Sequence, residues 1–360
     1  MKKDKLTAFS FACLLGSPIF SLFSGVGSYN LIHIAGIDAW ISVLISFILG
    51  IIPFLIFLYI FNYQPTLNIL EKNKYLFGKY LGTIFNLLIN IFIFFIGIVQ
   101  LFNISNFAIS QFLAKTPILW FMILFGLLII YNVYTGIENI SRVAIIFLGV
   151  IIFMTIISTA GLAPTIDTSN LKPYLENGVI PPFKAGLILS ITNVTPIFIL
   201  LIVQKDKISE KQNLPKYFTF FYFLSYLFAF LAIFLCLSSL GIYLCKIYQY
   251  PEYTVLKKIS LFKFIERIEN FIYIKWILNS FITLSLIIYH LSFSIKKESR
   301  KLIPTISTLL LIFFSSYIFK NNISFYFIGL HYFPIVCLAL FILYLIIGIN
   351  IFIRKRVRLF

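Results

Sequence analysis

Two polar interruptions within long apolar stretches decide how this chain folds: Gly16-Ser17-Pro18 near the N-terminus and Thr192-Asn193-Val194-Thr195-Pro196 in the middle. In hydrocarbon an unpaired backbone amide or carbonyl costs several kcal/mol, so a membrane-spanning helix normally stays continuous. A break is tolerated only where the backbone is buried in protein or lines a cavity. Broken helices at corresponding places in two halves of a chain indicate a solute site near the middle of the bilayer.

The composition is that of an integral membrane protein. Of 360 residues, 61% are hydrophobic and only 11% are charged, and the mean hydropathy is +1.01. A soluble domain carries about 25% charged residues. The net charge of +17 would suggest nucleic acid as a partner of a soluble protein. In a membrane protein it reflects the Lys and Arg that are held on the cytoplasmic side, so we expect no nucleic-acid partner.

The chain lacks the usual signatures of enzymes and metalloproteins. Its four cysteines, Cys13, Cys236, Cys245 and Cys337, show no paired spacing, which argues against a disulfide framework or a zinc site. We find no nucleotide-binding loop, metal cluster or nucleophile–base pair. The sequence therefore predicts a protein that is not an enzyme and needs neither a cofactor nor a metal.

Ten apolar stretches are long enough to cross a bilayer, for which a helix needs about 20 residues. No soluble domain interrupts them, so residues 1–360 are expected to form one bundle. An amphipathic segment at 63–81 is expected to lie along the interface. The predicted spans are 7–31, 38–62, 82–110, 117–134, 139–162, 182–203, 216–242, 264–294, 302–319 and 330–353.

The spans divide five and five, with a first repeat at about 7–162 and a second at about 182–353. Because five is odd, the sixth span enters the membrane from the side opposite to the first. Two such halves are inverted repeats, and their two breaks then fall at equivalent positions. We therefore predict an all-α polytopic membrane protein with a leucine-transporter-like 5+5 inverted repeat and broken helices one and six.

The distribution of basic residues predicts that both termini lie in the cytoplasm. With the N-terminus inside, most Lys and Arg residues outside the spans fall on the cytoplasmic side, as the positive-inside rule requires. These basic clusters lie at 2–5, 72–79, 205–216, 296–301 and 354–358.

The first break supplies one candidate part of a ligand site. Gly16 permits backbone angles that other residues resist, and Pro18 has no N–H and disrupts the preceding turn. If the chain unwinds here, the half-helix from Ile19 onward exposes amides that suit a carboxylate. Ser17 lies between them as a polar neighbour. The alternative is a proline kink in an ordinary spanning helix.

The sixth span supplies a second part. Ser190, Thr192, Asn193 and Thr195 cluster before Pro196. Their hydroxyls and carboxamide are able to bind an uncharged polar solute or the freed backbone. Alternatively, they only satisfy the kinked helix itself.

Polar residues of two further spans complete the predicted site. In the fold proposed above, the third and eighth spans flank the broken pair, and polar groups at that depth usually face the bundle interior. They contact the solute or join helices to one another, at about 1 kcal/mol per hydrogen bond. These residues are Gln100 and Asn103 in the third span and Asn279, Ser280 and Thr283 in the eighth.

Two charged groups are predicted to have a structural or gating role rather than to bind a solute. Glu266, Arg267 and Glu269 open the eighth span, where acidic groups favour the helix dipole and the arginine can pair with a neighbour. Glu138 and Arg142 open the fifth span at the i, i+4 spacing of an ion pair on one helix face.

Three segments, in the same order, resemble the B subunits of bacterial spore germination receptors. Residues 135–142 (TGIENISR) resemble their GxExxxR passage, and residues 170–178 (NLKPYLENG) resemble their external NLxPxxxxG loop. Residues 250–276, with Tyr250-Pro251, Glu266-Arg267-Ile268-Glu269 and Trp276, resemble their P…ERxE…W region.

This resemblance implies a permease-like subunit of the amino acid–polyamine–organocation superfamily in the spore inner membrane. Its partners would be the A and C subunits of a germinant receptor, and its ligand an amino acid, sugar or nucleoside. By position, the family's pocket would use Gly16, Ser17, Asn193 and Thr283. Relatives often carry a Phe-Pro-Phe-Gly-Glu run in the sixth span. Here that span has neither the Gly nor the Glu, which argues against recognition of an ammonium group there.

Two functions remain open at this point. One is a nutrient sensor that binds a small polar solute and passes the change to partner subunits. The other is a secondary transporter for amino acids, coupled to protons or Na⁺. A proton-driven carrier usually needs a carboxylate within the membrane, and the sequence shows none near the middle of a span, which favours the sensor.

Overall fold

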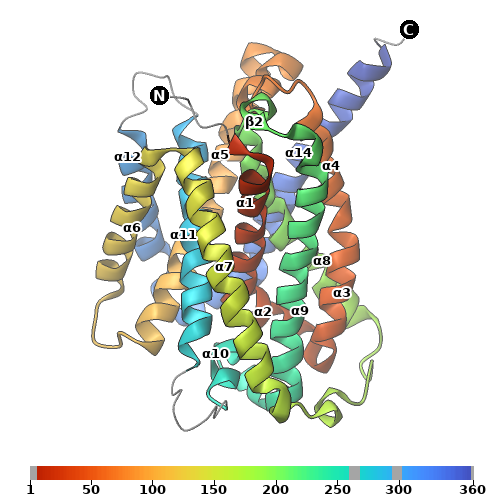
Figure 1. Cartoon of the computed structure of the whole chain (residues 1–360), viewed down its shortest axis with the longest axis vertical. Coiled ribbons are helices and arrows are strands. Elements are labelled where there is room, and N and C mark those ends of the chain that lie inside the picture. Colours follow the sequence, from red (N-terminus) through yellow and green to blue (C-terminus); the bar gives the residue numbers. More distant parts are fainter. Residues whose placement is uncertain (1–5, 259–267, 294–301, 358–360) are drawn as a thin grey trace.

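The computed structural model describes residues 6–258, 268–293 and 302–357, and Figure 1 shows them as a bundle of long helices. Nine helical segments of this part are long and apolar enough to cross a membrane, and the shorter apolar helix Ile303–Ile318 is a tenth candidate. The chain is thus a multi-pass, all-helical membrane protein, and the residues described here add only two strands of two residues each. The predicted class and the approximate number of spans are confirmed.

From Leu6 onward, the first half of the chain forms seven α-helices. They are preceded by the strand β1 (Leu6–Thr7), and short π and 3-10 segments at Phe23–Gly27 and Gly36–Asp38 join some of them. The helices are α1 (Ala8–Leu22), α2 (Ser28–Ala35), α3 (Ala39–Leu49), α4 (Ile51–Asn62), α5 (Ile69–Gln111), α6 (Ile118–Thr135) and α7 (Ile137–Leu162).

The described residues of the second half form seven more α-helices and a long 3-10 segment. Short 3-10 turns lie at Ala163–Thr165, Thr168–Leu171, Lys205–Lys207 and Lys211–Asn213. The longer elements are α8 (Ile180–Val194), the 3-10 segment Thr195–Ile202, β2 (Ile208–Ser209), α9 (Leu214–Ile247), α10 (Pro251–Leu256), α11 (Asn270–Ser292), α12 (Ile303–Ile318), α13 (Asn322–His331) and α14 (Phe333–Val357).

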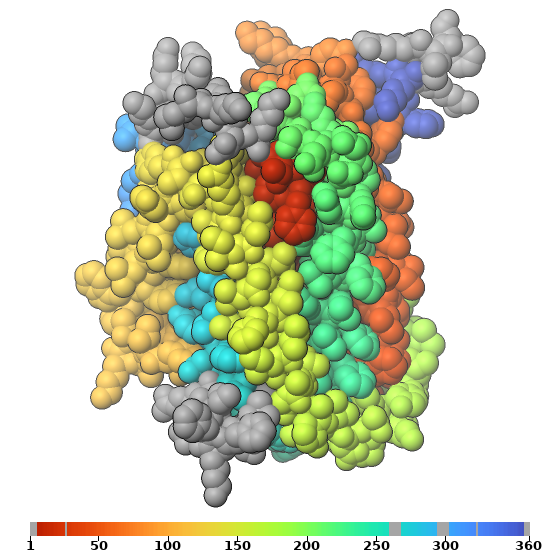
Figure 2. Space-filling view, viewed as in Figure 1, coloured from red at the N-terminus to blue at the C-terminus, as the bar shows by residue number. Residues whose placement is uncertain are grey.

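Helix one, which we define as α1 with α2, and helix six, which we define as α8 with its 3-10 extension, form the centre of the bundle. In the apolar stretch Ala8–Gly25 of helix one 89% of the residues are buried, and in that of helix six 83%, against 17% for the span that contains α7. In Figure 2 helix one emerges only as a narrow patch between α7 and α9. A central helix that is buried all round must satisfy any freed backbone group within the protein.

The break in helix one lies six to nine residues beyond the predicted position at Gly16-Ser17-Pro18, which is a correction. Pro18 lies inside the continuous helix α1, and the chain leaves helical geometry at Ser24 (φ −65°, ψ 135°) and Gly25 (φ 77°, ψ −97°). An interior proline removes one backbone hydrogen bond, which a helix survives as a kink. The angles at Gly25 are accessible only to glycine, so this residue decides where the helix ends.

Helix six changes its winding at the predicted place but does not open. α8 ends at Val194, and the chain continues from Thr195 to Ile202 as a 3-10 helix. The backbone stays helical at this junction (φ −87°, ψ −36° at Val194; φ −54°, ψ −37° at Thr195). The structure therefore shows a tightened helix here rather than an unwound segment.

Two other long helices contain a turn at a glycine with positive φ. The amphipathic segment predicted at the interface begins with a capping box, formed by Asn68 and Glu71, and turns at Gly78 (φ 80°) into the third span. α9 turns at Gly241 (φ 75°) before its last residues. Both changes of direction occur at the ends of spans, near the two faces of the bundle.

The start of helix one and the exit of helix six are tied together at one end of the bundle. β1 pairs in parallel with β2, with Leu6 opposite Ile208, so the two chain segments share a short ladder. Figure 1 places β2 and the end of α14 at this end and α10 at the opposite end.

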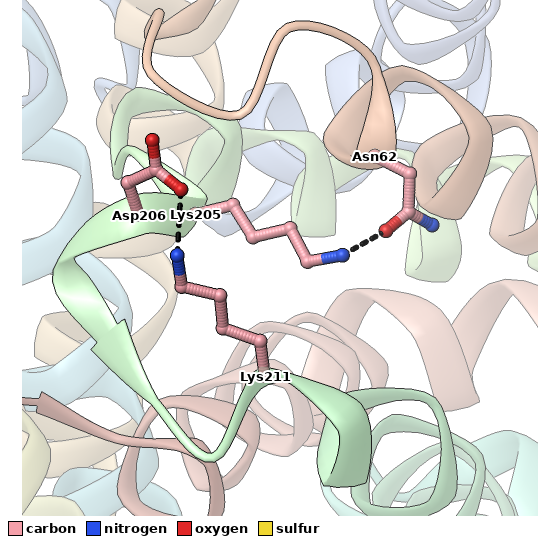
Figure 3. A network of polar contacts seen from close by, with 4 residues as sticks. All are labelled: Asn62, Lys205, Asp206 and Lys211. Carbon is pink, nitrogen blue, oxygen red and sulfur yellow. Dashed lines mark hydrogen bonds and ion pairs between the residues drawn. The ribbon is translucent and has the colours of Figure 1, made fainter.

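The segment that follows helix six is further held by two polar contacts, which Figure 3 shows. Lys205 Nζ donates to Asn62 Oδ1 at the end of α4 (2.5 Å), and Lys211 Nζ pairs with Asp206 Oδ1 (2.6 Å). Both contacts are exposed, and an exposed ion pair such as Lys211–Asp206 stabilises a fold by about 0–1 kcal/mol. The contacts therefore orient this segment more than they stabilise it.

Candidate functional site

The backbone groups freed by the break in helix one are bound by side chains. Asn103 on α5 donates from Nδ2 to the carbonyl of Ser24 (3.0 Å), and the Ser28 hydroxyl donates to the carbonyl of Gly25 (3.1 Å). Both bonds are buried, and a buried carbonyl left without a donor would cost about 1–3 kcal/mol. Side-chain hydrogen bonds within the protein therefore stabilise the break.

The last turn before the break is held by α11. Trp276 Nε1 donates to the carbonyl of Ser21 (3.1 Å), and the hydroxyls of Ser21 and Thr283 lie 2.9 Å apart. The Thr283 hydroxyl also donates to the carbonyl of Asn279 (2.9 Å). Thr283, a predicted site residue, therefore contacts helix one directly and joins it to α11.

A carboxyl group from a loop helix reaches the same break. Glu252 lies on α10, outside the candidate spans, and only 6% of it is exposed. Burial raises the pKa of this carboxyl above its ordinary value, although the N–H of Gly25, as a hydrogen-bond donor, favours the charged form. Its Oε1 is buried with no hydrogen-bond partner. The amide end of the break, where we predicted a ligand carboxylate, is therefore approached by a carboxylate of the chain itself.

A small cavity lies beside this carboxyl, between helices α1, α7, α9, α10 and α11. The space in which the centre of a water molecule can move measures about 40 Å³. Since one water needs about 10–15 Å³ by this measure, the cavity holds about three. Its polar lining includes Thr155, Ser158, Glu252 and Lys275.

A second cavity, of about 30 Å³, shares one wall with the first. Phe20 of α1 and Phe228 of α9 line both cavities, with ring centroids 6.3 Å apart and planes nearly perpendicular (86°). The polar lining of the second cavity includes Ser17 and Asn279. The two aromatic rings are thus the common boundary of the two spaces.

The predicted site residues are only partly brought together. Gly16, Ser17 and Asn279 line the second cavity, whereas Pro18 is buried in α1 outside both lining sets. Gln100 is fully buried and donates from Nε2 to Ser280 (2.7 Å), so it joins α5 to α11.

The residues of helix six are buried against helix one. Thr192 lines a third cavity of about 10 Å³ together with Gly27, and its hydroxyl donates to the carbonyl of Ile188 (3.0 Å). Asn193 is fully buried and both polar atoms of its side chain lack a partner, as does the hydroxyl of Thr195. A Cβ on Gly27 would lie 3.8 Å from Asn193 Oδ1, so the carboxamide faces the break.

The charged residues predicted to be structural lie away from these cavities. Glu138 and Arg142 are exposed at the start of α7, and their mutual pairing stays a prediction. Glu269 is partly buried immediately before α11, and Glu266 and Arg267 lie outside the described residues. Within residues 6–258, 268–293 and 302–357 no group of three or more His, Cys, Asp or Glu is placed to hold a metal ion.

Sequence reasoning missed the residues that build the break and its cavity. The glycine pair in Phe23-Ser24-Gly25-Val26-Gly27 was a usable signal, because two closely spaced glycines rarely lie within a spanning helix without a packing or backbone reason. Lys275 was another, since ionisable residues within spans are costly and usually functional. No sequence pattern predicted that the connecting segment with Glu252 would fold back and place this residue at the break.

Comparison with known sequences identifies the family. The sequence model described as "Spore germination protein" matches residues 6–325. Spore germination protein KB of Bacillus subtilis (strain 168) is 26% identical over 262 residues, which cover 71% of this chain and 69% of that protein. Spore germination protein XB of Bacillus anthracis is 23% identical over 325 residues, covering 89% and 90%.

Comparison with solved structures supports the fold. A Na⁺-coupled sialic acid symporter, solved in a substrate-bound outward-open state, superposes with a TM-score of 0.59 at 12% sequence identity. The match covers 92% of this chain and 78% of the symporter. At this identity the likeness concerns the arrangement of the helices alone.

The family match extends over most of the chain and agrees with the resemblance found in its motifs. The chain has the multi-pass helical architecture of a permease, and its relatives are B-subunit-like spore germination proteins. It belongs to the spore germination permease family, whose members are non-enzymatic receptor subunits.

Proposed function

We propose that this chain is the nutrient-sensing, permease-like subunit of a germinant receptor in the spore inner membrane. It binds a small polar nutrient beside the break in helix one and transmits the change to A and C subunits. The observation that carries the proposal is the break at Ser24–Gly25, enclosed by the bundle and bordered by a cavity with a polar and charged lining.

The finer architecture supports the same reading. We propose that about 7–162 and about 182–353 are inverted repeats, in which α1 with α2 corresponds to α8 with its 3-10 extension. Both are the central, most buried spans, and both change their winding within the membrane. The likeness to the symporter supports this arrangement. The basic residues near β1, β2 and the end of α14 support a cytoplasmic location for that end.

Signalling follows from the small size of the cavities. A nutrient larger than a few water molecules fits only when the surrounding helices part, so its binding favours a more open arrangement. A ligand shifts such an equilibrium tenfold for each 1.4 kcal/mol of preference for one state. Movement of helix one would reach the end of the bundle through the pair of β1 with β2, at the face offered to partner subunits.

A second function, proton-coupled transport of amino acids, is favoured by one observation. Glu252 is a buried carboxyl that lines a cavity beside the broken helix, and burial raises its pKa, so it binds a proton more readily than an exposed carboxyl does. The sequence predicted no carboxylate suited to a proton-driven carrier, and the position of Glu252 weakens that argument against transport. Transport and sensing would then use the same cavity.

Two assays separate the functions. Deletion of this chain in spores should abolish germination by at least one nutrient, and germination should return when the gene is restored. Purified protein in proteoliposomes should bind that nutrient without concentrating it. Concentrative uptake driven by a proton or Na⁺ gradient would replace the sensor with the transporter. If a deletion strain answers every nutrient like the wild type, the sensor is refuted, and absence of gradient-driven uptake would refute the transporter.

A further inference from the structure

Two side chains of opposite charge line the cavity beside the helix-one break. Glu252 comes from α10 and Lys275 from the second turn of α11, and 6% of each residue is exposed. The remainder of the lining is apolar or carries hydroxyl groups, as at Ser158 and Thr159. A carboxyl group and an amino group therefore line the same cavity.

These two groups do not neutralise each other. No ion pair within 4.0 Å joins them, and no hydrogen bond of the Lys275 ammonium to any described residue is seen. On Glu252, Oε1 is buried and lacks a partner. Burying an ionised group without a partner is costly, and proteins normally pair such groups or bind something to them.

The opposite charges across one cavity match the two charges of an amino acid. We propose that this cavity is a binding site for a zwitterionic α-amino acid, with Glu252 accepting hydrogen bonds from its ammonium group and Lys275 donating to its carboxylate. This inference rests on the proposed sensing function and names its ligand class and anchoring residues. It also supplies the acidic group that helix six lacks.

The location differs from the site predicted at the helix break itself. The carbonyls of Ser24 and Gly25 are already bound by Asn103 and Ser28, and the N–H of Gly25 faces Glu252. The freed backbone is therefore engaged within the protein, and the ligand contacts side chains. Because Glu252 also contacts the break, a bound ammonium group acts on the junction of α1 and α2 through this one carboxyl.

The aromatic pair sets the direction in which the site enlarges. With room for about three waters, the cavity admits an amino acid only if its walls move. Phe20 and Phe228 separate it from the second cavity, which holds Ser17 and Asn279. Rotation of these rings joins the two cavities. The ammonium and carboxylate groups of the ligand then lie near Glu252 and Lys275, and its side chain extends toward Ser17.

The test uses spores in which this chain is the only B subunit of a germinant receptor. A panel of the common L-amino acids, glucose, fructose and inosine is applied, and each active amino acid is then compared with its amide and its N-acetyl derivative. We expect a response to at least one amino acid and a loss of at least about thirtyfold in potency for both neutralised forms. This part of the test needs no variant and is independent of folding.

Variants then assign the charges. Glu252→Gln and Lys275→Met should each raise the amino acid concentration for half-maximal germination by about thirtyfold or more, with receptor levels unchanged on immunoblots. Glu176→Gln and Lys257→Met, at exposed positions, are matched controls and should respond like the wild type. With Glu252→Gln the amide and the amino acid should remain distinguishable, whereas with Lys275→Met they should become equivalent.

The outcomes separate the two proposals. A response to sugars or inosine alone, or equal potency of an amino acid and its neutral derivatives, overturns the zwitterion site but leaves the sensor. Wild-type potency in both Glu252→Gln and Lys275→Met also overturns it. Failure of the whole panel in wild-type spores removes the proposed function instead.

Discussion

Replacing Gly25 with alanine should damage the fold at one identifiable point. Gly25 has φ 77° and ψ −97°, a conformation that side chains with a Cβ rarely adopt. A Cβ built there would lie 2.6 Å from Asn103 Oδ1 and 2.6 Å from Cη2 of Trp276. Neither neighbour is free to withdraw, because Asn103 Nδ2 and Trp276 Nε1 both bind carbonyls of helix one.

The magnitude has two parts. Holding a residue other than glycine in such a region costs on the order of 1–3 kcal/mol. Forcing an extra methyl group into a packed interior costs about 1–3 kcal/mol more. We therefore expect Gly25→Ala to lower the free energy of unfolding by about 2–6 kcal/mol, and to weaken the nutrient response because the break shifts.

Thermal unfolding of the detergent-solubilised protein measures the effect, with two alanine variants as controls. Gly36→Ala has a similar positive φ (61°) but nothing within 4 Å of the new Cβ, so it reports backbone strain alone. Gly149→Ala lies in the helix α7 with open space around it and should be neutral or stabilise by up to about 1 kcal/mol. Stability of Gly25→Ala equal to that of Gly149→Ala would refute the break, and equality with Gly36→Ala would refute the close packing.

Three further predictions test other contacts. Trp276→Phe removes the donor to the carbonyl of Ser21 and should lower stability by about 1–3 kcal/mol, measured by the same unfolding assay; an unchanged transition would show that this bond is dispensable. Lys72→Met removes the donor to the carbonyl of Ile60 (2.8 Å) at the end of α4 and should lower the stability by a similar amount. Limited proteolysis should then cleave this end of the bundle faster than in the wild type. Cleavage at the wild-type rate would contradict this prediction. Because the folded pKa of Glu252 is raised, the folded state binds the proton more tightly, so stability should fall as the pH rises above the ordinary value of about 4.5 and level off above the folded pKa. Unfolding temperatures across this pH range should show a smaller fall for Glu252→Gln, and identical profiles would contradict the assignment.

The overall architecture could be predicted from the sequence because the bilayer imposes strong rules. Apolar stretches of the required length reveal spans, and their order along the chain gives the two halves. Most ends agree with the structure within a few residues; the fifth span, for example, was expected at 139–162 and is found at Ile137–Leu162. The first span instead runs on to Ala35, because α2 continues the helix after the break.

The predicted location of the first break was wrong for a physical reason. Proline is a visible helix breaker in the sequence, yet Pro18 is accommodated within α1, where Ser21 Oγ donates to its carbonyl (3.4 Å). The break depends on the positive φ of Gly25, which requires glycine and the donors that hold it open. Those donors, such as Asn103 and Trp276, come from distant spans, and only the packed structure shows that they converge.

For the predicted site residues, burial could be predicted from the sequence but their grouping around a cavity could not. Polar residues within spans were correctly expected to face the interior, as the full burial of Gln100, Asn193 and Thr283 shows. Which of them share a cavity depends on helix rotation and packing, which spacing along one helix does not determine. The charged pair of Glu252 and Lys275 lies 23 positions apart on two elements, so it is visible only in three dimensions.

A structure of the receptor determined by electron cryomicroscopy, with a saturating germination-active amino acid, tests the central claim most directly. We predict that helix one is interrupted at Ser24–Gly25 and that density for the amino acid lies between Glu252 and Lys275, with Phe20 displaced toward the second cavity. A helix one that runs unbroken through Gly25, or an amino acid bound at a place remote from both charged side chains, would contradict the account.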